Sequence, residues 1–154
     1  MTLLLGFVLG MASGLRSMTP AAVLAWAAQS HWPHLDQTGF AFMSARITAY
    51  ILTVGACVEL VFDKLPITPS RLTPGPLGAR VVLGGLCAAT LCAAFQQSAI
   101  FGAVVGGLGG FAGAWVGYHV RRYLTTTRKA PDLLVALVED AITIGSAVFA
   151  VSRL

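Results

Sequence analysis

The sequence predicts an all-α integral membrane protein, a single transmembrane domain over residues 1–154 built as a bundle of about five transmembrane helices. Three observations support this fold class. Of the 154 residues, 56% are hydrophobic and only 10% are charged, and the mean hydropathy is +0.80. Apolar stretches of about 20 residues recur along the chain, and charges or prolines separate them. So little polar surface cannot coat a soluble globule, so we expect a lipid bilayer to surround the chain.

The first hydrophobic segment, residues 2–30, contains a break. It is long enough for one tilted span, but the stretch from Arg16 to Pro20 interrupts it. The segment is therefore either one kinked helix or two half-helices that form a re-entrant pair. A single helix predicts a cytoplasmic N-terminus, and a re-entrant pair predicts an N-terminus on the opposite side.

Four further helices are predicted from the length and the ends of the apolar stretches. They cover about residues 44–64, 76–95, 100–122 and 132–152. Pro76 suits the first turn of its helix, where a missing backbone N–H leaves no acceptor unsatisfied. Basic residues cluster in and beside loops 65–79 and 120–131, which predicts that both loops are cytoplasmic in a multi-pass membrane protein.

Glycines recur in a pattern that suggests an internal repeat. Gly6, Gly10 and Gly14 return 96 residues later as Gly102, Gly106 and Gly110. With Glu59 and Glu139 on later helices, this pattern is compatible with an inverted repeat, as found in many transporters. The alternative is that glycine at every fourth position only lets helix backbones approach. A second stripe, Gly109, Gly113 and Gly117, leaves one glycine face for the bundle and one for a second subunit, which predicts a homo-oligomer.

Ionisable residues inside the predicted spans are the candidate functional residues. A charge in hydrocarbon costs about 2.5–3.5 kcal/mol on insertion scales, so it persists where it is paired, hydrated or functional. Glu59 and Asp63 share one helix face, and Glu139 lies on a polar face about a quarter-turn from Asp140. Arg16 is the natural counter-charge for Glu139, Asp140 or Glu59. The candidate ion-binding or relay residues are Arg16, Ser17, Thr19, Glu59, Asp63, Glu139 and Asp140.

Three functions remain open for these residues. The first is a small transporter or channel in which they bind or relay a proton, a cation or a small polar solute. The second is a lipid-phosphate-handling protein or membrane enzyme, with Arg71 and Arg80 beside a proline-rich loop as headgroup candidates. The third is a structural membrane protein whose charges only fix helix packing.

Several function classes are disfavoured. No nucleophile elbow, P-loop, zinc-protease or Rossmann motif occurs in a strand-to-helix context, so we assign no catalytic residue and expect no cofactor. The cysteines Cys57, Cys87 and Cys92 lie in apolar runs without metal-ligand spacing, which indicates small core residues and no metal site. The Lys and Arg residues lie mostly in two loops, which argues against a nucleic-acid partner.

Five ordered motifs add a resemblance to a known family. They are Gly14 to Pro20, Glu59 to Pro66 with Thr68 to Arg71, Gly75 to Arg80, Gly117 to Arg122, and Val138 to Ile142. Together they resemble the small bacterial membrane proteins grouped as domain-of-unknown-function family 4126. The resemblance spans nearly the full chain and implies a multi-pass protein of the bacterial inner membrane, without an activity or a substrate. Its motifs contain most of the intramembrane charges and the break near Arg16.

Overall fold

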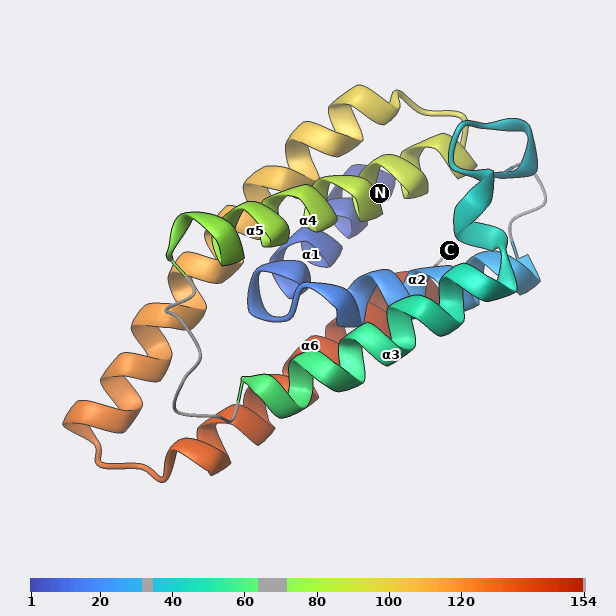
Figure 1. The fold of residues 1–154 in the computed structure, drawn as a ribbon. Helices are drawn as coiled ribbons and strands as arrows, with labels where there is room; N and C mark the ends of the chain where they lie inside the picture. The colour runs from blue at the N-terminus through green and yellow to red at the C-terminus, as the bar shows by residue number, and fades with distance from the viewer. Residues whose placement is uncertain (32–34, 64–71, 154) are drawn as a thin grey trace.

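The computed structural model describes residues 1–31, 35–63 and 72–153, and these residues form helices and turns without a β-strand. Six α-helices follow in the order α1 (Thr2–Leu15), α2 (Met18–His31), α3 (Arg46–Phe62), α4 (Pro74–Ala94), α5 (Ala99–Arg122) and α6 (Asp132–Ser152). Two short 3₁₀ turns, η1 (Leu35–Gln37) and η2 (Ala41–Ser44), precede α3, and a π-helical turn, η3 (Tyr123–Thr127), follows α5. Figure 1 shows the end of α3 and the α5–α6 turn at one end of the bundle, with the α4–α5 turn and both termini toward the other.

The all-α fold class is confirmed, and three of the helices are long and apolar enough to cross a membrane. They are α4, α5 with its π-helical extension, and α6. The other helices are shorter, with 17 residues in α3 and 14 each in α1 and α2. At about 1.5 Å per residue, a 14-residue helix covers about 21 Å, less than the roughly 30 Å of a hydrocarbon core. The structure therefore supports three spans by length and composition, against the five that were predicted.

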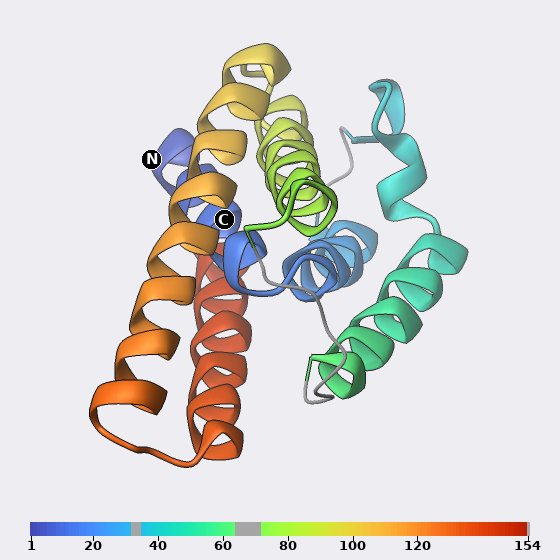
Figure 2. The ribbon, with the colours of Figure 1, turned by 60° about the vertical axis from the view of Figure 1, so that its left-hand side comes forward.

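The first segment is two separate helices. Its break lies at Arg16, whose extended backbone (φ −138°, ψ 115°) ends α1, and α2 begins at Met18. Figures 1 and 2 show that the chain changes direction sharply between α1 and α2. Pro20 falls in the first turn of α2, where its missing N–H has no intrahelical acceptor to serve. Of the two alternatives that the sequence left open, the structure has the half-helices.

Helices α1, α4 and α5 pack with their backbones in contact at glycines. A Cβ added to Gly10 would lie 2.9 Å from Gly106 Cα, and a Cβ added to Gly84 would lie 2.7 Å from the Gly106 carbonyl oxygen. A Cβ added to Gly14 would likewise lie 2.6 Å from Gly113 Cα. Only glycine permits such approach, as at other close helix crossings in membranes. The glycine stripes of α1 and α5 therefore face each other.

This packing changes two of the sequence interpretations. Gly10 faces Gly106 and Gly14 faces Gly110, so α1 and α5 run in the same direction, whereas equivalent helices of an inverted repeat would run in opposite directions. Gly102 and Gly110 lie against α4, and Gly109 and Gly113 lie against α1. Both stripes on α5 are thus covered within the chain, so these positions do not supply an open face for a second subunit.

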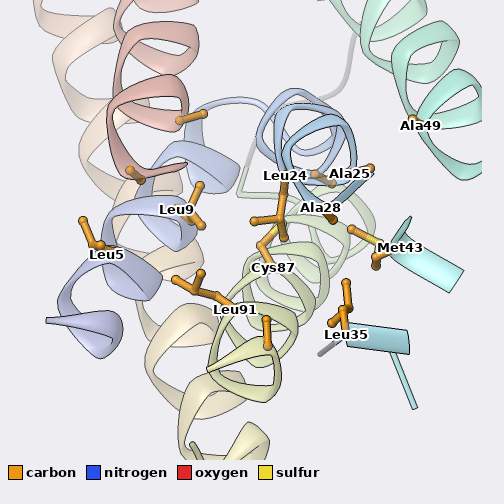
Figure 3. Packing of buried hydrophobic residues seen from close by; sticks show 14 residues of the cluster. Leu5, Leu9, Leu24, Ala25, Ala28, Leu35, Met43, Ala49, Cys87 and Leu91 are labelled. Carbon is orange, nitrogen blue, oxygen red and sulfur yellow. The ribbon is translucent and has the colours of Figure 1, made fainter. Parts of the chain in front are cut away.

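The apolar core lies between α1, α2 and α4. Leu9, Leu24, Cys87 and Leu91 are wholly buried there, and Figure 3 shows their side chains pointing toward one another. Leu35 and Met43, from the two 3₁₀ turns, close another side of this core. On α3, by contrast, the large apolar side chains are exposed, among them Ile47, Ile51, Val54 and Val58. That face suits contact with lipid.

Candidate functional site

Arg16 lies at the centre of a polar cluster, at the break between α1 and α2. Its side chain is 0% exposed. Nε donates to Asp140 Oδ1 at 2.7 Å, and Nη2 forms an ion pair with the same oxygen. Nη1 donates to Asp63 Oδ2 at 2.8 Å and to the carbonyl oxygen of Glu59 at 3.3 Å. One guanidinium therefore joins the break to α6 and to the C-terminal end of α3.

Glu59 caps the N-terminus of α2. Its Oε1 accepts hydrogen bonds from the Ser17 backbone N–H at 2.8 Å and from Ser17 Oγ at 2.7 Å. Its Oε2 accepts the Met18 N–H at 2.9 Å. The first amides of a helix lack intrahelical acceptors and carry partial positive charge, so a carboxylate there is favoured. Two sets of contacts thus hold the break. The Arg16 guanidinium binds carboxylates of α6 and of the end of α3, and Glu59 binds the backbone amides at the start of α2.

Arg80 brings α4 into the same cluster. Its side chain is 4% exposed, and Nη2 lies 3.9 Å from Glu59 Oε1 and 4.0 Å from Asp63 Oδ2. A Cβ added to Gly110 would lie 2.6 Å from the Arg80 carbonyl oxygen, so α5 also approaches α4 closely at this level. The sequence interpretation placed Arg80 with Arg71 as a headgroup candidate. Arg80 instead lies buried beside two carboxylates, and Arg71 lies outside the described residues.

A second group of charges lies where α5 meets α6. Arg121 donates from Nε and Nη2 to the two carboxylate oxygens of Asp132, at 2.9 and 2.7 Å. Its Nη1 lies 3.8 Å from Glu139 Oε2. Of the three partners predicted for Arg16, Asp140 pairs through its carboxylate and Glu59 through its backbone carbonyl. The carboxylate of Glu139 pairs with Arg121, in this second group.

Sequence reasoning missed Arg121 and Asp132 as members of the network and also missed the pairing of Arg16 with Asp63. It treated Arg121 only as a loop charge that reports topology. A signal was present, because Asp132 and Glu139 are seven residues apart on one helix face and Arg121 precedes them across a short turn. A basic residue there can reach both carboxylates.

The hydroxyl residues of the break differ in their roles. Ser17 binds Glu59 through both its amide and its hydroxyl group. Thr19, in the first turn of α2, is 7% exposed, and its Oγ1 has no hydrogen-bond partner among the described residues. Buried hydroxyls in proteins usually have a partner. Thr19 therefore adds a polar group to the cluster that packing alone does not explain.

The carboxylates are mostly buried without being sealed. The side chains of Glu59, Asp63, Glu139 and Asp140 are 13%, 12%, 10% and 10% exposed. Arg16 itself has no exposed side-chain surface. An ion or a proton that approaches from outside therefore meets a carboxylate before it meets Arg16.

The chain can also be placed among known proteins. The family model described as "Domain of unknown function (DUF4126)" matches residues 3–153, nearly the whole chain. The chain belongs to this family. The resemblance predicted from the five motifs is thus confirmed. Searches of curated proteins and of solved structures found no match. The DUF4126 description names no activity, so a function for this member has to come from the geometry of the site.

Proposed function

We propose that this DUF4126 protein is a small transporter or channel of the bacterial inner membrane, in which the carboxylates around Arg16 bind or relay a proton or another cation. One observation carries the proposal: a fully buried arginine at a helix break bridges carboxylates from two other helices. Broken helices at membrane depth are typical of the binding sites of secondary transporters. Buried charges of this kind commonly mark ion or proton paths.

The depth of the cluster supports this proposal. Asp140 follows Asp132, the first residue of α6, by eight positions, which corresponds to about 12 Å along the helix. Arg80 follows Pro74, the first residue of α4, by six positions, which corresponds to about 9 Å. Helix α6 begins at the end of the bundle where α5 ends, and α4 begins on the same side but closer to the middle of the bundle (Figures 1 and 2). The cluster would then lie between the bilayer surface and the midplane, on the side of loops 65–79 and 120–131, which we take as cytoplasmic.

The chemistry of the cluster favours a proton or a cation over an anionic headgroup. Glu59 and Asp63 lie beside Arg80, and Asp63 and Asp140 bind Arg16, so an incoming phosphate would meet carboxylates. A proton or cation that binds Asp140 competes with the Arg16 guanidinium for the same oxygens. Loss of that contact would loosen α6 from the break. This exchange gives a physical basis for alternating access, in which occupancy shifts the population of two arrangements.

Flux into proteoliposomes tests the proposal. Proteoliposomes that contain the purified protein and an internal pH-sensitive dye are exposed to a pH gradient and, separately, to Na⁺ and K⁺ gradients. We expect faster dissipation of at least one gradient than in empty vesicles. Asp140→Asn and Asp63→Asn should reduce this flux at least tenfold. Asp36→Asn, an exposed carboxylate outside the cluster, is the matched control and should leave it unchanged.

Two results would refute transport through the cluster. One is gradient dissipation no faster than in empty vesicles for protons, Na⁺ and K⁺. The other is wild-type flux in both cluster variants. Folding is checked by the size-exclusion profile and helical circular dichroism of each variant. Normal folding with no flux in any sample would favour the structural role for these charges.

We also propose that the protein forms a homo-oligomer in the membrane. Because the two glycine stripes of α5 are covered within the chain, the interface would use exposed apolar faces such as that of α3. The mass of the protein in detergent, measured by light scattering with the detergent contribution subtracted, tests this. A mass equal to one chain of 16.0 kDa would exclude a stable oligomer.

A further inference from the structure

An apolar groove of about 430 Å³ runs between α5 and α6, with α1 as its floor. Its walls are almost entirely aliphatic or small, and Arg121 and Glu139 are the charged residues that line it. The other lining residues include Met11, Gly113, Val116, Val120, Val138 and Ile142. A volume of this size lies within the range of small-molecule sites. The groove borders the Arg16 cluster, because Leu15 and Glu139 line it, but Arg16, Asp63 and Asp140 are not among its lining residues.

The length of the groove matches one leaflet of a bilayer. Along α5 and the start of η3, its lining runs from Gly113 to Leu124, which is eleven positions or about 16 Å at 1.5 Å per residue. Half of a roughly 30 Å hydrocarbon core is about 15 Å. The groove therefore extends from the end of α5 to about the midplane. A single acyl chain has this length and this chemistry.

The end of the groove nearest the α5–α6 turn is basic. Arg121 lines it, held in place by its two hydrogen bonds to Asp132. Arg128 and Lys129 lie in the turn that joins α5 to α6, and both are exposed. An apolar slot that opens at such a cluster complements an amphiphile with an apolar chain and a negative headgroup.

We propose that one anionic phospholipid of the leaflet on the side of the α5–α6 turn binds here. Its acyl chain lies between α5 and α6 against α1, and its phosphate lies at the turn beside Arg128 and Lys129. Arg80, a headgroup candidate predicted from sequence, does not line this groove. The inference does not depend on the proposed transport function.

Native mass spectrometry of the full-length protein tests this inference. The probes are phosphatidylglycerol, phosphatidylcholine with the same acyl chains, and palmitate, each added to delipidated protein at the same concentration. We expect wild-type protein to retain one phosphatidylglycerol at least fivefold more often than phosphatidylcholine. Val138→Trp fills the groove and should reduce this retention at least fivefold. Val148→Trp, an exposed valine on the same helix outside the groove lining, is the matched control and should retain the lipid as wild type does.

The headgroup is tested by a charge variant. Arg128→Gln should remove the preference for phosphatidylglycerol, while Arg46→Gln, an exposed arginine at the start of α3, should keep it. Val138→Phe replaces Val138→Trp if the larger variant is not monodisperse. Three results would overturn the proposal: no retained phosphatidylglycerol, equal retention in the groove-filled variants and wild type, or retention of palmitate in preference to both phospholipids.

Discussion

Arg16 Nε and Asp140 Oδ1 lie 2.7 Å apart, although 124 positions of sequence separate the two residues. The hydrogen bond connects the break of the first segment to α6, the last helix of the chain. Asp63, at the end of α3, takes a second hydrogen bond from the same guanidinium. The break therefore joins the first segment, the end of α3 and α6, and a substitution in one of these parts should alter the packing of the other two.

Removing the charge of Arg16 should destabilise the protein strongly. Arg16→Gln leaves Asp140 and Asp63 buried with fewer donors, and breaking a buried ion pair costs about 3–5 kcal/mol. We expect a large fall in the thermal unfolding midpoint of the detergent-purified protein. Arg122→Gln, at an exposed site, should change stability by at most about 0.5 kcal/mol. Equal midpoints for the two variants would show that the Arg16 pairs contribute little.

Glu59 should hold the first turn of α2. Glu59→Ala removes the acceptor of the Ser17 and Met18 amides, and loss of a helix cap costs about 0.5–2 kcal/mol. We expect faster hydrogen–deuterium exchange in the first turn of α2, measured by mass spectrometry. Glu59→Gln keeps one acceptor oxygen and should give an intermediate rate. The idea fails if exchange in this turn is the same in wild type and in Glu59→Ala.

The glycine contact between α1 and α5 should tolerate no side chain. In Gly10→Ala the new methyl group would lie 2.9 Å from Gly106 Cα, a backbone atom that cannot move alone. Overpacking of this kind costs about 1–3 kcal/mol. Gly145 of α6 has no atom within 4 Å of an added Cβ, so Gly145→Ala should gain about 0.5–1 kcal/mol from helix propensity. Unfolding midpoints that shift in the opposite order would contradict the packing of α1 on α5.

The turn at Arg16 also predicts which ends of the chain share a side of the membrane. Since α1 and α5 run in the same direction, Thr2→Cys and Gln97→Cys should react with a membrane-impermeant maleimide from one side, and Thr126→Cys from the other. Cys57→Ala serves as the background, because Cys57 is exposed while Cys87 and Cys92 are buried. Labelling of Thr2→Cys together with Thr126→Cys would mean that the first segment crosses the membrane once.

Much of the helix pattern could be predicted from sequence because hydropathy and helix ends are local properties. The prediction for α6, residues 132–152, matches the structure, and those for α4 and α5 differ from it by at most two residues at either end. The form of the first segment could not be settled, since Arg16 and Pro20 are compatible with a kink or with a turn. The decision comes from partners far along the chain, Glu59 for α2 and the glycines of α5 for α1.

Part of the candidate site could also be predicted, because a charge within an apolar segment is a local property of the sequence. Charge in an apolar segment identified Arg16, Glu59, Asp63 and Asp140 as residues that need partners, and the structure brings these four together. The sequence does not show which carboxylate pairs with which cation, because the pairing depends on the relative rotation of the helices. Glu139 and Asp140 are neighbours in sequence, yet one pairs with Arg121 and the other with Arg16.

The packing of Gly10 on Gly106 has a consequence for how the protein is made. Helix α1 is synthesised about a hundred residues before the glycine face of α5 on which it packs. With 14 residues, α1 is also too short to cross a bilayer by itself. Arg16, likewise, is synthesised long before Asp140, its last partner. The contacts that bury α1 against α5 can therefore form only after the second half of the chain has been synthesised. The hydrogen bond from Arg16 to Asp140, on the C-terminal helix, forms later still.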